Sequence, residues 1–128
     1  MISKRLSLQS GRKGTNMSIN SKEKGKRGEL EVVQLFRDAG FPAERTAQYC
    51  GNSPEGEADV RGVPGVHIEV KRVEHLNIDD ALDQSKRDAG KTDGGIPIVV
   101  HRRSGKCWKV TMDAKDWIVL FKKAREME

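Results

Sequence analysis

Three acidic residues and one lysine are of the types that metal-assisted phosphodiester hydrolysis requires: Glu29, Asp59, Glu69 and Lys71. Carboxylate oxygens can hold Mg²⁺ or Mn²⁺ against a phosphate, and an ammonium group can orient the attacking water or help to deprotonate it. Carboxylates gathered without a cation would repel one another, which is a further reason to expect a metal ion. This chemistry requires the chain to bring the four side chains together.

Glu69 and Lys71 lie in HIEVKR, an otherwise apolar and β-branched run at residues 67–72. Side chains alternate along a strand, so Glu69 and Lys71 share one face with His67, for which we expect a structural role. An acid-x-Lys triplet taken alone is usually a solvated ion pair that contributes little to stability. The same spacing recurs at Asp113 and Lys115, where the start of a helix explains the acid as a cap or dipole partner.

The elements that would position the other two acids can be predicted from periodicity. Residues 22–39 have a helical pattern in which Glu29 falls inside the apolar arc, whereas Glu31 projects from the opposite side. Strands are predicted at residues 43–49, 58–62 and 66–72, as a β-meander. Asp59 therefore stands on the strand before Glu69, and the three carboxylates and the lysine can converge.

The remainder of the chain predicts a second helix, two strands and a third helix. Asn77 or Asp79 can cap the second helix, which ends near residue 89, and the strands cover residues 96–103 and 106–112. The last helix begins at about residue 113, and four of its apolar side chains should pack: Trp117, Ile118, Leu120 and Phe121. The expected fold class is α/β, a mixed sheet flanked by helices in the order α-βββ-α-ββ-α.

Positive charge is concentrated near the N-terminus. The net charge is +5, but residues 1–28 hold eight of the 24 basic side chains and one of the 19 acidic ones, which leaves 16 basic and 18 acidic groups elsewhere. We interpret residues 1–21 as a flexible basic arm and residues 22–128 as one domain, because a chain of this length can build one modest core. Such an arm suits the binding of nucleic-acid phosphates through counterion release.

Composition also limits the cellular setting. Cys50 and Cys107 have no metal-ligand spacing, no run reaches the length of a membrane span, and the N-terminus lacks the apolar segment of a secretion signal. We therefore expect a soluble protein of the reducing cytoplasm, in a bacterium or a phage-infected host cell, with no membrane partner.

The order Glu29, Asp59, Glu69-Val70-Lys71 resembles the PD-(D/E)XK nuclease superfamily, and more closely the small Holliday junction resolvases of archaea and their phage relatives. The similarity runs from about residue 22 to 120 and includes KGKRGELE at 24–31, QYCGN at 48–52, ADVRGVPGVHIEVKRVEHLN at 58–77 and DQSKRDAG at 83–90. It implies a restriction-endonuclease-like fold and a Mg²⁺-dependent or Mn²⁺-dependent endonuclease that cuts branched DNA as a homodimer.

The resemblance also implies roles for individual residues. Asp59 and Glu69 would be metal ligands together with the Val70 carbonyl, Lys71 would serve the water, and Glu29 would complete the site directly or through a bound water. Gln84 would hydrogen-bond a metal-bound water or a phosphate. The candidate DNA contacts are Lys26, Arg27, Arg45, Tyr49 and Arg72. Contacts of this kind position the phosphate backbone without reading its sequence.

Two alternatives stay open at this point. One is a different nuclease task, such as restriction-like or nicking cleavage of ordinary duplex DNA. The other is a DNA-binding protein without chemistry, in which the basic arm dominates and the acids are merely solvated. Convergence of Glu29, Asp59, Glu69 and Lys71 would favour an enzyme, but nothing in the sequence distinguishes a junction from a duplex.

Overall fold

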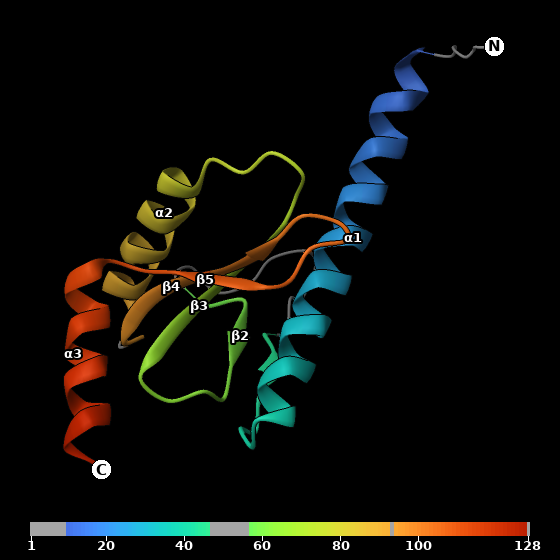
Figure 1. The fold of residues 1–128 in the computed structure, drawn as a ribbon. Coiled ribbons are helices and arrows are strands. Elements are labelled where there is room, and N and C mark those ends of the chain that lie inside the picture. The colour runs from blue at the N-terminus through green and yellow to red at the C-terminus, as the bar shows by residue number, and fades with distance from the viewer. Residues whose placement is uncertain (1–9, 47–56, 93, 128) are drawn as a thin grey trace.

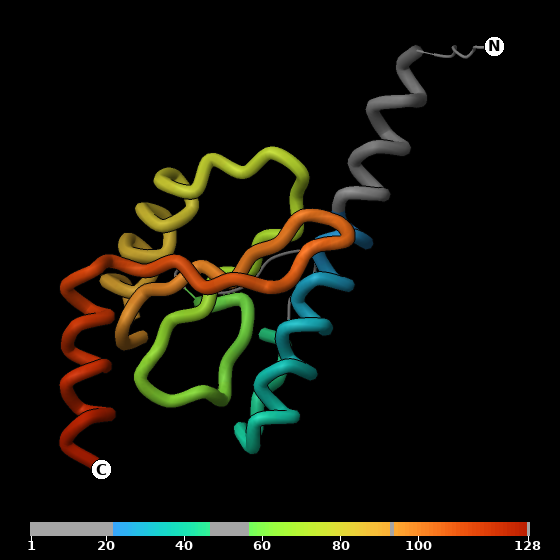
Figure 2. Tube along the Cα trace, viewed as in Figure 1, coloured from blue at the N-terminus to red at the C-terminus, as the bar shows by residue number. Residues whose placement is uncertain are grey.

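The computed structural model describes the backbone of residues 10–46, 57–92 and 94–127 (Figure 1). Side chains are described from residue 22 onward in those ranges, which are the part of the chain coloured in Figure 2. The helices are α1 (Ser10–Asp38), α2 (Ile78–Lys91) and α3 (Ala114–Glu126). The strands are β1 (Glu44–Arg45), β2 (Val60–Arg61), β3 (Val66–Arg72), β4 (Ile96–Arg102) and β5 (Lys109–Thr111). This order confirms the predicted α-βββ-α-ββ-α succession.

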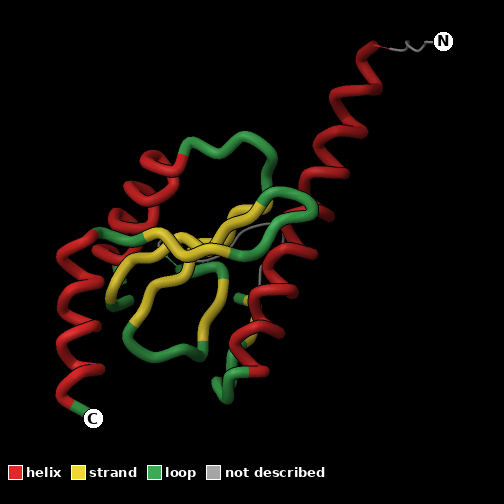
Figure 3. Tube along the Cα trace, viewed as in Figure 1, coloured by secondary structure: helices red, strands yellow, loops and turns green. Residues whose placement is uncertain are grey.

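The strands form one mixed sheet in the order β1-β2-β3-β4-β5 (Figure 3). The first three strands are an antiparallel meander, as predicted, and β4 and β5 are also antiparallel. The central strands β3 and β4 are parallel, and their register pairs Glu69 with Val99. A parallel pair needs a crossover connection, which α2 supplies.

The two faces of the sheet are covered by different helices (Figure 1). On one face Ile68 and Val70 of β3 pack against Val32 and Val33 of α1. On the other face Val99 of β4 packs against two residues of α2, Ala81 and Leu82. Alternation along β3 therefore directs His67, Glu69 and Lys71 toward the α2 face, while α1 closes the face opposite.

α2 is capped and anchored as its sequence indicates. The Asn77 side chain accepts a 3.1 Å hydrogen bond from the amide of Asp80, which makes Asn77 the N-cap. On the buried side of the helix, Ser85 is fully buried, and its hydroxyl lies 3.2 Å from the Ile98 carbonyl and 3.4 Å from the His67 carbonyl. These contacts fix α2 over the junction of β3 and β4.

Two helix predictions require correction. α1 begins at Ser10 and not near residue 22, because a packed helix can extend upstream without a second nucleation step. The assignment of residues 1–21 to a separate arm stays a prediction. α3 has no buried residue, and Trp117, Ile118, Leu120 and Phe121, which were expected to pack, are 38–53% exposed. None of the described elements covers this apolar surface.

Among the described residues, none of the helices is both long enough and apolar enough to cross a membrane.

Candidate active site

Asp59 and Glu69 lie side by side because of the register between β2 and β3. Val60 pairs with Ile68 in the antiparallel ladder, so the residue before Val60 adjoins the residue after Ile68. The Asp59 amide donates to the Ile68 carbonyl at 2.9 Å, and its carboxylate accepts a 2.9 Å hydrogen bond from the Val70 amide. Asp59 thus lies beside β3 at the point where β2 begins.

All four residues singled out from the sequence line one groove. Its volume is about 410 Å³, and its walls include Glu29 from α1, Asp59 just before β2, and Glu69 and Lys71 from β3. Val70 also lines this groove. Glu29 therefore meets Asp59 and Glu69, which follow it by 30 and 40 positions in the chain, at one edge of the sheet.

Glu29 is paired with a cation at the rim of the groove. Its Oε1 accepts a 2.6 Å hydrogen bond from Arg45 Nε, and the two side chains are 14% and 27% exposed. Over the described part of the chain, the ligand atoms of Glu29, Asp59 and Glu69 do not all lie within 4.8 Å of one another. In this arrangement Arg45 neutralises the helix carboxylate, and the Val70 amide holds that of Asp59.

Burial and mutual repulsion change the acidity of the two strand carboxyls. The pKa of Glu69 is raised from 4.5 to about 8, mainly by burial and next by the neighbouring Asp59, against the opposing effect of Lys71. Burial likewise raises the pKa of Asp59 to about 6, although the Val70 amide opposes the shift. An opposite charge nearby favours the ionised form of a carboxyl. A cation bound between these two carboxyls would therefore relieve their mutual repulsion.

The candidate DNA contacts are placed unequally. Lys26 and Arg27 are exposed on α1. Arg45 is engaged by Glu29, and the Arg72 side chain is 17% exposed, with Nε 3.9 Å from Glu31. Tyr49 lies outside the described residues.

Gln84 lies on α2 at a second hollow of about 460 Å³, which Lys71 and Arg87 also line. Lys71 therefore borders two depressions, one toward α1 and one toward α2.

Glu31, expected on the side of α1 opposite to Glu29, also contacts the fold. Its Oε1 accepts hydrogen bonds from Arg102 Nη2 at 2.8 Å and from Trp108 Nε1 at 3.2 Å. The Arg102 guanidinium also lies 5.2 Å from the centroid of the Trp108 ring. The chain around β4 and β5 reaches the second flank of α1, so both flanks of this helix contact the fold.

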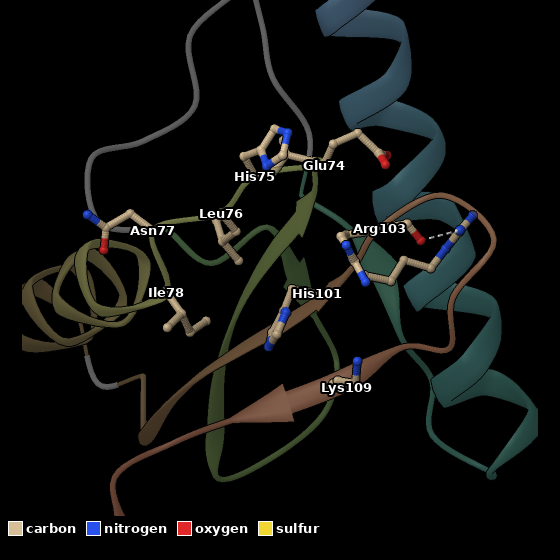
Figure 4. A pocket seen from close by; sticks show the side chains of 10 residues that line it. Glu74, His75, Leu76, Asn77, Ile78, His101, Arg103 and Lys109 are labelled. Carbon is tan, nitrogen blue, oxygen red and sulfur yellow. Dashed lines mark hydrogen bonds between the residues drawn. The ribbon is translucent and has the colours of Figure 1, made fainter.

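Another hollow, of about 720 Å³, does not include Asp59 or Glu69 (Figure 4). It lies beyond the end of β3, with Glu74 and His75 on one side and His101 and Lys109 on the other (Figure 4). Glu74 lines the candidate active-site groove as well. We regard this basic hollow as a neighbouring surface and not as the centre of chemistry, because it lacks the paired carboxyls.

The sequence did not single out Asp88, which lies close to Glu69 in the structure. One oxygen from each of these acids and a ring nitrogen of His67 lie within 4.8 Å of one another. Asp88 follows Ser85 by three residues and Gln84 by four, so helical spacing could have placed it on the side of α2 that faces the sheet.

Comparison with known proteins shows a similarity to a solved structure. No protein-family model matches the sequence, and no curated protein matches it. Among solved structures, the chain is similar to Hjc, a Holliday junction resolvase from the archaeal hyperthermophile Archaeoglobus fulgidus. Sequence identity is 26% and the TM-score is 0.53, over 69% of this chain and 76% of Hjc. The chain therefore has a resolvase-like nuclease fold.

Proposed function

We propose that this protein is a metal-dependent endodeoxyribonuclease that hydrolyses phosphodiester bonds in branched DNA, with four-way junctions as the preferred substrate. The observation that carries the proposal is the shared groove of Glu29, Asp59, Glu69 and Lys71 at the edge of β3. The similarity to Hjc, a Holliday junction resolvase, supports the choice of substrate.

The residues present fit a hard divalent cation. Asp59 and Glu69 offer carboxylate oxygens, and Glu29 can add another from α1. The amide and carbonyl of one strand residue point to the same edge, so the Val70 carbonyl faces the side from which its amide contacts Asp59. When bound, Mg²⁺ or Mn²⁺ would stabilise charge on the phosphate and favour ionisation of the attacking water.

Lys71 is the residue that would act on the water. It follows Glu69 by two positions on the same face of β3, and it lines the groove together with both strand acids. Its ammonium group can orient the water that attacks phosphorus, or assist the transfer of the water proton. Gln84 lines the hollow on the other side of Lys71 and can hold a phosphate or a water there.

The surface around the groove suits a DNA backbone. The groove and both neighbouring hollows share Val73, so the three depressions meet at the end of β3. Their basic residues come from several elements and include Lys24, Lys71, Arg87, Arg103 and Lys109. We propose that these residues, with Lys26, Arg27 and a basic arm at residues 1–21, contact phosphates. Such contacts fix the position of DNA without reading its sequence.

A second copy of the chain would supply a second active site. Four-way junctions offer two symmetric strands, so two active sites related by a two-fold axis match the substrate. The apolar side of α3, with the exposed Val110 of β5 beside it in the chain, is the surface we assign to this homodimer. A run of five exposed apolar residues in one helix, from Trp117 to Phe121, is the kind of patch that marks a protein interface.

The proposal is tested by competition in one tube. A four-way junction and a linear duplex of the same arm sequence, labelled differently, are incubated with Mg²⁺ and read on a denaturing gel. We expect paired incisions across the junction and little cleavage of the duplex. Equal cleavage of junction and duplex would support a nuclease but contradict the preference for junctions. A site-specific double-strand break in the duplex would favour a restriction-like enzyme.

Variants separate cleavage from DNA binding in the same assay. Asp59→Asn and Glu69→Gln should abolish cleavage while junction binding survives, because they remove the metal-binding oxygens and no basic contact. Asp38→Asn, at an exposed position at the end of α1, is the matched control and should cleave normally. Full cleavage in a chelator, or by either site variant, would contradict the proposed mechanism.

A further inference from the structure

A second set of possible metal ligands lies on the α2 side of β3. A ring nitrogen of His67 and one carboxylate oxygen each from Glu69 and Asp88 lie within 4.8 Å of one another. His67 and Glu69 are 1% and 5% exposed, and Asp88 is half-buried. Within the described ranges this is the one group of three such side chains at that spacing.

The histidine supplies an independent observation. Its Nε2 is buried and has no hydrogen-bond partner among the described residues. The other ring nitrogen, Nδ1, lies against Gly94, where even a Cβ atom would come within 2.5 Å of it. Buried polar atoms are nearly always paired, so an unpaired imidazole nitrogen beside two carboxyls calls for a ligand. The nitrogen left to bind that ligand is Nε2.

We infer that His67, Glu69 and Asp88 form a binding site for a divalent transition-metal ion, such as Mn²⁺ or Zn²⁺. One imidazole with two carboxylates is a ligand set that suits these ions better than Mg²⁺, which prefers oxygen and retains its water. Three protein ligands leave at least one coordination position for water. This site goes beyond the proposed nuclease function, because it concerns metal binding by residues outside the catalytic groove, apart from the shared Glu69.

A hollow reaches the histidine of this cluster but neither of its two acids. His67 borders a hollow of about 300 Å³ that opens between the turn before β3 and the end of α2. Glu57, Thr92 and Gly94 also line it, so an acidic side chain stands at the entrance. This hollow does not include Asp59 or Lys71, so it is separate from the candidate active-site groove.

The test is pulsed electron paramagnetic resonance of Mn²⁺ bound to the metal-free, full-length protein. We expect ¹⁴N coupling from one imidazole in the natural protein, and its loss in His67→Asn. His75→Asn, which changes an exposed histidine, should retain the coupling. Asp59→Asn should also retain it while losing DNA cleavage, so failure of this site and failure of the nuclease proposal give different results.

A second variant keeps the inference testable if His67→Asn does not fold. Asp88→Asn should weaken Mn²⁺ binding at this site by at least about 10–100-fold, the cost of losing even an outer-shell partner. Asp83→Asn, at an exposed position on the same helix, should leave the affinity unchanged. Absence of ¹⁴N coupling in the natural protein, coupling that persists in a folded His67→Asn, or unchanged affinity in Asp88→Asn would each overturn the inference.

Discussion

Arg45 Nε donates a 2.6 Å hydrogen bond to Glu29 Oε1 and so joins β1 to α1 at the rim of the candidate active-site groove. The pair is largely shielded from water, with Glu29 14% and Arg45 27% exposed. Arg45 was expected to contact DNA, yet in the free protein it balances the charge of an acid that is a candidate metal ligand. An incoming phosphate or cation would therefore compete with an interaction that already exists.

Arg45→Gln should lower the free energy of unfolding by about 1.5 kcal/mol, the lower end for a hydrogen bond to a charged group, since water can still reach Glu29. The control is Arg61→Gln. Arg61 also makes a 2.6 Å contact, with Glu44, but both side chains are more than half exposed, so its loss should cost at most about 1 kcal/mol. Urea unfolding measures both changes, and equal losses would show that shielding of the Glu29 pair has no energetic effect.

Lys71→Ala should slow single-turnover cleavage by about 10²–10⁴-fold, the usual contribution of a group that assists proton transfer. Mn²⁺ binding should survive, because an ammonium group is not a metal ligand. Lys115→Ala is a matched control, since Lys115 follows Asp113 with the same spacing but is exposed on α3. Asp113 pairs there with Lys86 at 2.8 Å and makes no side-chain cap hydrogen bond. A Lys71→Ala enzyme of normal rate would exclude Lys71 from the chemistry.

The metal-free protein should become less stable as pH rises. The pKa of Glu69 is raised to about 8 by burial and that of Asp59 to about 6, so folding favours their protonated forms. In the unfolded chain the carboxyls of Glu69 and Asp59 ionise near their ordinary pKa values of 4.5 and 3.8. The free energy of unfolding therefore begins to fall as pH rises past these values, and it continues to fall to about pH 8. Thermal unfolding in a chelator from pH 4 to 9 measures this, and Glu69→Gln should flatten the upper part of the slope. Stability that rises over this interval would contradict the assignment.

The N-terminal arm can be tested by deleting residues 1–20, which removes four basic side chains. Each lost phosphate contact should reduce the log-log salt slope of duplex binding by about 0.9, so the slope should flatten by at most about 3.6. The rate of cleavage at saturating DNA should not change. Identical salt slopes for the two forms would show that the arm does not contact DNA.

Residues that depend on local pattern could be predicted from the sequence. The bounds of β3 are those expected, and the turn residues Pro64 and Gly65 mark the start of its β-branched run. Asn77 was among the two predicted caps, and the strand pair of Asp59 and Glu69 followed from a meander whose strands are close in sequence. Alternation then put Glu69 and Lys71 on one face without any knowledge of the fold.

Features that depend on how elements are rotated against one another could not be predicted. Asp88 approaches Glu69 because Ser85 anchors α2 on β3 and β4, and the sequence does not specify that rotation. Glu31 contacts Arg102 because the β4–β5 region reaches the second flank of α1. The packing predicted for α3 was wrong for a related reason. Apolar residues at helical spacing predict that a helix surface is buried. They do not tell whether the element that buries it belongs to the same chain.

The apolar side of α3 provides the last prediction. Trp117 and Phe121 stack with ring centroids 5.0 Å apart and stand half-exposed, so together they form a flat aromatic surface. If this surface joins two copies, Trp117→Lys with Phe121→Lys should weaken the dimer by about 10²-fold or more, since each substitution removes a large apolar contact. Light scattering after size exclusion should then give 14.3 kDa and not twice that mass.

Lys122→Gln, at an exposed position on the same helix, should leave the mass doubled. The monomeric variant should still nick junctions, because each groove is built within one chain, but the two incisions should no longer occur together. A natural protein of 14.3 kDa at micromolar concentration, or a double variant that remains dimeric, would remove α3 as the interface. Paired incision by a strictly monomeric variant would break the link between the dimer and the two cuts, because two sites on a two-fold axis were the reason to expect it.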